Sequence, residues 1–289
     1  MNPTALSNTH PFNEALALTL QALPEAAGTA PSTRVSEGHS HPAYANMVGP
    51  FGGVTAAQML QAVLLHSDRL GDPLALTVNY AAGLRDAPFR IEARPARTNR
   101  STQHWTLALT QVDEDGSESV YVTATAVTAA RRSTWSVVES PMPSVPKPEA
   151  LERVVPPGRT RWVERYDMRA IHGRIPLQWD GTEADSLTQL WVRDDPPRPL
   201  DFVSLAAMAD VFFPRVWRRR ALLTPAGTVS ITVYFHVGAD GLAETGTGWL
   251  LGQAQAQSFF NGFFDQSAQL WNEAGHLLAT THQIVYFKE

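Results

Sequence analysis

One carboxylate in the C-terminal half of the chain lies alone among apolar side chains. Asp210 is the single charged residue between Leu205 and Phe213, in a segment that has the composition of a buried helix. A buried carboxylate without partners is strongly destabilising, so other polar groups should compensate it. If those groups also hold a water molecule, the carboxylate can act as a general base. A purely structural carboxylate, capping a backbone or facing water at the helix edge, is the alternative.

Two polar residues on apolar strands could supply such partners. Thr228 lies just before an apolar strand, and Gln283 lies inside the last strand, beside Ile284 and Val285. A hydroxyl and an amide can both hydrogen-bond a carboxylate or a water. The alternatives are that the threonine follows ordinary strand propensity and that Gln283 faces solvent.

Gly52 and Gly53 open the first predicted helix. Paired glycines there allow close backbone packing. Alternatively, the unpaired N–H groups of the helix start could face an oxyanion or a phosphate.

A basic run ends the second predicted helix, at Arg215, Arg218, Arg219 and Arg220. Cations stabilise a helix C-terminus regardless of function. The other interpretation is that these guanidinium groups bind the phosphates of a ligand.

The elements that must position these residues occur twice, in the same order. The first half predicts a helix at 54–65, strands at 76–80, 89–94 and 105–112, a turn at 113–116 and a strand at 120–127. The second half predicts a helix at 202–217, strands at 231–235, near 249 and at 259–271, a turn at 272–275 and a strand at 277–287. The repetition indicates a duplicated α+β unit.

The helix at 54–65 is apolar on nearly every face, with only Thr55, Gln58 and Gln61 polar. Such a helix cannot lie on a surface with one wet face and must be enclosed. A long apolar helix wrapped by an antiparallel sheet is typical of a hotdog fold, so two units predict a double hotdog. A pair of β-sandwiches is the alternative, which the central helices disfavour.

A proline-rich stretch divides the two units. Six prolines between residues 141 and 158 each fix φ and remove a backbone donor. We therefore expect an N-terminal domain at 1–140, a linker at 141–158, and a C-terminal domain at 159–289 that carries the candidate site.

Composition narrows the function classes. The 289 residues carry a net charge of −5, which disfavours nucleic acid as a partner, and the absence of cysteine excludes disulfides and thiolate metal sites. No positively charged leader precedes the apolar stretch at 15–20, and no window is long enough to span a membrane. We expect a cytoplasmic protein.

The GxSxG, GxxxxGK[ST] and HExxH motifs are also absent. Their absence disfavours a serine hydrolase, a nucleotidase and a zinc protease, respectively.

In combination, these residues resemble the acyl-CoA thioesterase II family of double-hotdog enzymes. Asp210, Thr228 at the start of TVSITVYFH, and Gln283 in ATTHQ match the family's water-holding Asp, Thr and Gln, and the opening Gly52-Gly53 matches its first helix. The chain departs from the family pattern at Ser230 and Ile231, where the family has an Asp-His pair, and at Ile284, where it has an acidic residue.

The resemblance implies hydrolysis of acyl-CoA thioesters, with Asp210 as general base and Thr228 and Gln283 orienting the water. Gly52, Gly53, Arg215 and Arg218 would then contact the acyl-CoA. Neither a metal nor another cofactor is required, and analogy suggests a homo-oligomer. Because the first helix has no carboxylate, we expect one active site per chain.

Two other functions stay open at this level. The fold could serve as a non-catalytic acyl-CoA or lipid-binding module. A hotdog hydratase or dehydratase usually relies on an Asp/His pair, for which His236 and His282 are the nearby candidates.

Overall fold

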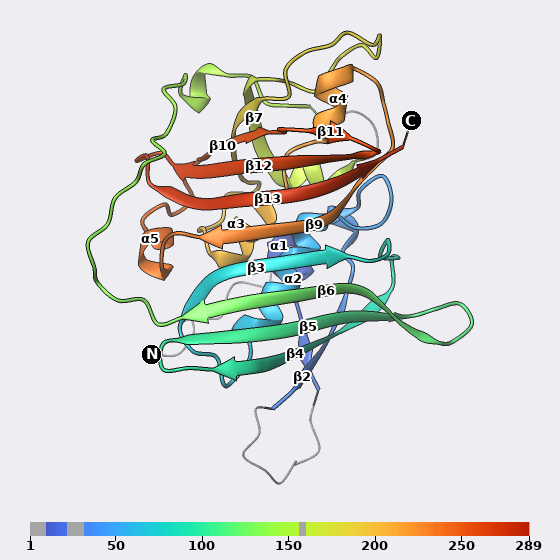
Figure 1. Cartoon of the computed structure of the whole chain (residues 1–289), viewed down its shortest axis with the longest axis vertical. Coiled ribbons are helices and arrows are strands. Elements are labelled where there is room, and N and C mark those ends of the chain that lie inside the picture. Colours follow the sequence, from blue (N-terminus) through green and yellow to red (C-terminus); the bar gives the residue numbers. More distant parts are fainter. Residues whose placement is uncertain (1–9, 22–31, 156–159, 289) are drawn as a thin grey trace.

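A single antiparallel sheet runs through both halves of the chain (Figure 1). The structure is a computed structural model that describes residues 10–21, 32–155 and 160–288. Its described strands follow the order β1-β2-β4-β5-β6-β3-β9-β13-β12-β10-β8-β7, with β11 paired to β12. Strands β3 and β9 join the two halves edge to edge, so the fold is a double hotdog.

The N-terminal half contributes the first six strands. Its elements are α1 (Pro11–Ala15), β1 (Thr19–Leu20), β2 (Arg34–His39), a 3₁₀ turn (Pro42–Tyr44), α2 (Gly52–Leu64), β3 (Asp72–Tyr80), β4 (Pro88–Thr98), β5 (Thr102–Val112) and β6 (Glu118–Ala129).

The C-terminal half contributes the other seven. After 3₁₀ turns at Pro148–Ala150 and Arg161–Arg165, its elements are β7 (Tyr166–His172), β8 (Thr188–Asp194), α3 (Phe202–Met208), α4 (Arg215–Arg220), β9 (Ala226–Phe235), α5 (Ala239–Ala243), β10 (Leu250–Gln255), β11 (Phe259–Phe260), β12 (Phe263–Asn272) and β13 (Leu277–Phe287).

The junction between β3 and β9 contains the pseudo-twofold axis of the duplication. Thr77 pairs with Thr232, and their hydroxyl oxygens lie 3.0 Å apart. These two residues occupy the same place in the repeated segments 76–80 and 231–235. The pairing of equivalent residues across the junction supports the duplication predicted from the sequence.

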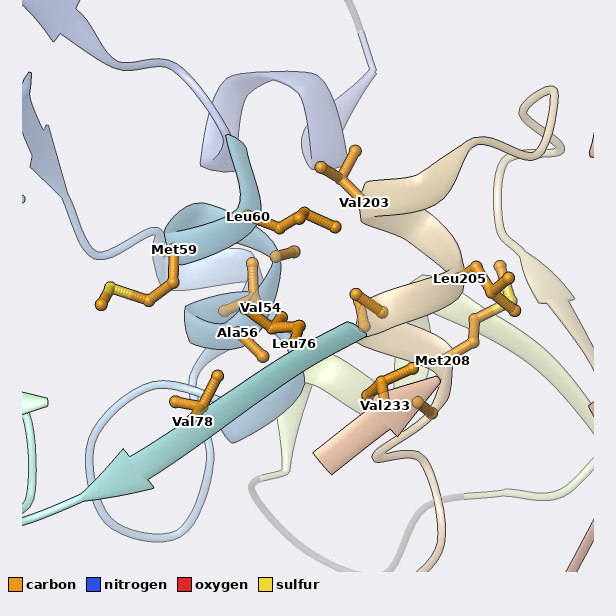
Figure 2. Close-up of a cluster of buried hydrophobic side chains, with 14 of the residues drawn as sticks. Val54, Ala56, Met59, Leu60, Leu76, Val78, Val203, Leu205, Met208 and Val233 are labelled. Atoms are coloured by element: carbon orange, nitrogen blue, oxygen red, sulfur yellow. The ribbon is translucent and has the colours of Figure 1, made fainter. Parts of the chain in front are cut away.

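Helices α2 and α3 pack against each other on the inner side of the sheet. Helix α2 contacts α3 as well as β3, β4, β5 and β6, and Figure 2 shows apolar side chains of both helices beside those of β3 and β9. Gly53 permits this close approach, because a Cβ there would lie 2.5 Å from the carbonyl oxygen of Ala207. The enclosed helix was predicted correctly, and close backbone packing explains Gly53.

The second helix differs from its prediction at 202–217. Helix α3 ends at Met208, and α4 begins only at Arg215, after Pro214. Proline lacks a backbone N–H and disfavours helical geometry in the residue before it, so it interrupts the helix. Asp210 therefore lies just beyond the end of α3, outside the helix body.

Four of the described strands, β1, β2, β7 and β8, were not predicted, and the strand expected at 259–271 is divided. Asn261 and Gly262 have φ angles of 52° and 78°, which turn the chain between β11 and β12. The aromatic residues on both sides of this turn obscured it in the sequence.

The described part of the proline-rich stretch packs against the second half. The indole N–H of Trp191 donates to the carbonyl of Pro146 at 2.8 Å, and Met142, Val145 and Leu151 contact the tryptophan cluster on the outer face of β8, β10 and β12. Residues 156–159, where the linker was expected to end, lie outside the described residues. The domain limits at 140 and 158 stay a prediction.

Within the described residues, none of the helices combines the length and apolar character needed to cross a bilayer.

Candidate active site

Asp210 and Gln283 meet on the inner side of the sheet. On β13, alternate side chains point inward, and Gln283 is only 3% exposed between the buried Thr281 and Val285. Its amide Nε2 donates a hydrogen bond of 3.0 Å to Oδ1 of Asp210. The solvent-facing alternative for Gln283 is therefore wrong.

A β-bulge brings Thr228 to the same face. Ile284 pairs with Ser230, but the next residue, Val285, pairs with Thr228, so Val229 is an extra residue in β9. Because side chains alternate along a strand, this insertion turns Thr228 to the inner face. Its hydroxyl donates to Oε1 of Gln283 at 3.3 Å. The structure thus brings Asp210, Gln283 and Thr228 together.

The first half of the chain completes the surroundings of Asp210. The backbone N–H of Gly53 donates a hydrogen bond to its carboxylate, and a Cβ on Gly52 would lie 2.8 Å from its Oδ2. The start of α2 therefore meets an anion, as the dipole of a helix N-terminus favours. Gly53 uses its N–H on the protein's own carboxylate, and a contact of either glycine with acyl-CoA stays a prediction.

Tyr80 is a site residue that sequence reasoning missed. Its hydroxyl donates to the carbonyl oxygen of Gly52 at 2.7 Å and would lie 3.4 Å from a Cβ on Gly52. Burial, and then the negative charge of Asp210, raises the pKa of Tyr80 well above its usual value, so it stays protonated. The sequence did contain one signal for this residue, a tyrosine hydroxyl at the end of the apolar strand at 76–80. Its partner, Gly52, lies 28 positions away along the chain.

The protonation of Asp210 is balanced between opposing effects. Burial raises its pKa to about 7, whereas the hydrogen bonds from Gln283 and Gly53 lower it. The side chain is only partly shielded from solvent. A carboxylate of this kind can accept a proton from water and release it again near neutral pH.

Among the residues that the structure describes, only those of the second half form such a cluster. In the first half, Leu74 is the extra residue of a corresponding bulge in β3. The residues there that correspond to Thr228 and Gln283 are Pro73 and Ala126, which offer neither a hydroxyl nor an amide. The geometry agrees with the expectation of one site per chain.

Two of the departures from the family pattern, Ser230 and Ile284, lie on the other face of the sheet, whereas Ile231 is buried on the inner face, where it pairs with Gln283. Ile284 is 42% exposed, and its partner Ser230 donates to Oδ1 of Asn79 across the junction. Neither residue lies on the inner face with Asp210.

The structure contradicts the expected contact between Arg215 and acyl-CoA. Arg215 is 0% exposed, and its guanidinium donates to the carbonyls of Phe213 and Ser186 and to the hydroxyl of Thr188. Arg215 begins α4, and its side chain points into the protein, where its hydrogen bonds connect α4 to the segment that carries Ser186 and Thr188. Arg218 is partly exposed, 3.9 Å from Asp185, and its contact with substrate stays a prediction.

Two family models match this chain. Residues 41–131 match the N-terminal domain of acyl-CoA thioesterases, and residues 140–287 match their C-terminal domain. The chain belongs to the acyl-CoA thioesterase family. As a member of this family it is a thioester hydrolase. No protein of curated function matches it.

Solved structures share the fold over the full length. A hot dog fold protein of unknown function from Alicyclobacillus acidocaldarius is 47% identical, with 97% of this chain and 99% of that chain covered and a TM-score of 0.86. The tesB protein of Mycobacterium avium subs paratuberculosis is 19% identical, with 96% and 98% covered and a TM-score of 0.72. Acyl-CoA thioesterase II TesB2 of Mycobacterium marinum is 20% identical, with 96% and 98% covered and a TM-score of 0.67.

Proposed function

We propose that this thioesterase hydrolyses acyl-CoA by direct attack of a water molecule held by Asp210, Thr228 and Gln283. The observation that carries the proposal is the continuous hydrogen-bonded series from Thr228 to Gln283 to Asp210. Family membership supports the substrate class, and the carboxylate with a pKa of about 7 supports the role of general base.

The proposed reaction needs one proton acceptor and one acyl acceptor. Asp210 takes a proton from the water while the water oxygen attacks the thioester carbonyl, giving a tetrahedral intermediate. The C–S bond then breaks, and the thiolate leaves with the proton that Asp210 returns. The products are the free acid and coenzyme A.

Gln283 has a positioning role in this proposal. Its amide nitrogen donates to Oδ1 of Asp210, which leaves Oδ2, on the side of Gly52, as the oxygen that receives the proton. The Thr228 hydroxyl fixes the other end of the Gln283 amide and can also accept a hydrogen bond from the water.

The test is thiol release from a panel of acyl-CoAs, followed with a thiol-reactive dye. We expect steady release without a burst and no acyl-enzyme trapped by hydroxylamine, because water attacks directly. Asp210→Asn should abolish turnover. Binding of acyl-CoA without any thiol release would instead indicate the non-catalytic binding module.

The hydratase alternative loses support from the positions of the two histidines. His282 faces the outer side of the sheet, opposite to its neighbour Gln283, and its Nε2 lies 3.4 Å from Asp265. His236 follows the end of β9 and contacts the hydroxyl of Thr280. Neither imidazole is among the hydrogen-bond partners of Asp210, so the Asp/His pair that a hydratase needs has no counterpart at this carboxylate.

A further inference from the structure

Two adjoining cavities lie where α4, β11 and the end of β13 meet. Their volumes are about 290 and 390 Å³. We call them together the α4–β11 cleft, and its lining residues are Glu183, Val216, Arg219, Arg220, Phe259, Phe260, Asn261, Gly262 and Phe287. Arg220, Phe259 and Phe287 line both cavities, which makes the cleft continuous.

The cleft opens from the same strand that carries the candidate site. Gln283, Val285 and Phe287 are alternate residues of β13 and share its inner face. Phe287 lies four residues beyond Gln283, which corresponds to about 13 Å along a strand. Val285, which pairs with Thr228, lies between them. Val285 is 5% exposed and packs with Val216 and Phe264, so a ligand that extends from the cleft to Asp210 must pass beside this apolar cluster.

The cleft is a local positive region on an acidic protein. The chain has a net charge of −5, yet the last turn of α4 gives the cleft both Arg219 and Arg220. Arg218 lies outside the lining, 3.9 Å from Asp185. Arg219 pairs with Glu183 at 2.7 Å, but the two side chains are 39% and 63% exposed. An ion pair this exposed contributes little stability, so a phosphate can replace Glu183 as the partner of Arg219.

Aromatic side chains form the rest of the lining. Phe260 is 72% exposed, at the turn whose Asn261 and Gly262 have positive φ angles. Phe259 and Phe287 pack against Phe264 on the inner side. An aromatic face can stack on a planar base, and a neighbouring arginine can bind a phosphate. The cleft therefore suits a ligand that contains both groups.

We propose that the α4–β11 cleft binds the adenosine phosphate end of coenzyme A, with Arg219 and Arg220 on the phosphates and Phe260 against the adenine. This rests on the proposed function, since it extends the same substrate away from Asp210. The thiol-bearing arm then spans the distance along β13. An acyl chain is the less suitable occupant, because two guanidinium groups and a carboxylate would lose hydration against it. Arg219 and Arg220 replace Arg215 as the phosphate-binding arginines.

The test compares two substrates that differ only in the nucleotide. The double variant Arg219→Ala/Arg220→Ala and the wild type are assayed with an acyl-CoA and with the same acyl group on pantetheine. We expect the KM for acyl-CoA to rise at least about tenfold, as the loss of a charge-assisted contact implies. The kcat, and the KM for the acyl-pantetheine, should not change. Arg100→Ala, at an exposed turn of the first half, is the matched control and should alter neither substrate.

The outcomes separate this proposal from the proposed function. Equal effects of the double variant on both substrates, or no effect on either, would overturn the nucleotide site while leaving hydrolysis in place. If no thioester is hydrolysed, calorimetric titration with adenosine 3′,5′-bisphosphate still tests the cleft. The proposed nucleotide site is supported if adenosine 3′,5′-bisphosphate still binds to Asp210→Asn. It must also bind more weakly to Phe260→Ala and to the double variant than to the wild type. No binding to the wild type overturns it.

Discussion

Oδ2 of Asp210 occupies the space that a side chain on Gly52 would fill, since a Cβ built there would lie 2.8 Å from it. The carboxylate comes from the second half of the chain and the glycine from the first. The two halves therefore build one site between them, although only the second contributes the Asp, Thr and Gln. The carboxylate of Asp210 can lie here only because residue 52 has no Cβ.

We predict that Gly52→Ala disables the site with little loss of stability. The new methyl group would push the carboxylate away from Gln283 and from the Gly53 N–H, and we expect kcat to fall by at least about tenfold, as for other misplaced catalytic groups. Gly227→Ala is the matched control, because a Cβ there meets nothing within 4 Å. Steady-state thiol release measures both variants, and normal activity of Gly52→Ala would contradict this geometry.

The pH dependence of kcat/KM should follow the ionisation of Asp210. A general base must be deprotonated, and burial raises the pKa of this carboxylate to about 7. The rate should therefore rise about tenfold per pH unit below that value and level off above it. A profile that is flat between pH 5 and 8 would exclude Asp210 as the base.

Removing the hydrogen bond from Gln283 should move that profile to higher pH. The amide N–H stabilises the charged form of Asp210, so Gln283→Leu raises the pKa of Asp210 further. Thr228→Val should instead lower kcat by up to about tenfold, the loss expected for one hydrogen bond, with a smaller shift of the midpoint. The same midpoint in Gln283→Leu and wild type would show that the amide does not tune the carboxylate.

Asp210→Asn should be more stable than the wild type at pH 8 but not at pH 4. The pKa of Asp210 in the folded protein, about 7, is higher than its ordinary value of 3.8. The wild type therefore loses stability as the pH rises from about 4 to 7, whereas asparagine does not titrate. Urea unfolding at several pH values measures this difference. A constant difference across the range would show that the carboxylate is not destabilised in the folded state.

Arg215→Met should lower the free energy of unfolding by roughly 1–3 kcal/mol, because buried acceptors lose their donor. Arg215 is 0% exposed and donates to the Ser186 carbonyl and the Thr188 hydroxyl. On the same helix, Arg219→Met changes an exposed side chain and should stay within about 0.5 kcal/mol of the wild type. Urea unfolding compares the two. Equal stability of both variants would contradict the buried role of Arg215.

Local patterns in the chain were sufficient for much of the fold. Alternation and turn residues predicted β13 at its observed limits, and Gly116 and Gly275 have the positive φ angles that their turns require. The enclosed helix at 54–65 followed from its apolar composition. The break of the second helix was missed, because the apolar run continues up to Pro214 while the backbone does not remain helical.

The duplicated architecture can be read from the residues alone. The same holds for the special place of Asp210, because a lone charge in an apolar segment is anomalous wherever the segment folds. What surrounds that charge, in contrast, depends on how the two halves pack. Gly53 donates to it from the other half of the chain, where Tyr80 binds the carbonyl of the neighbouring Gly52. A single extra residue, Val229, selects the face on which Thr228 lies. Contacts between distant segments depend on register and packing, and neither is encoded in the spacing of neighbouring residues. For the same reason, the packing of α4 alone decided that Arg215 is internal while Arg219 and Arg220 line the cleft.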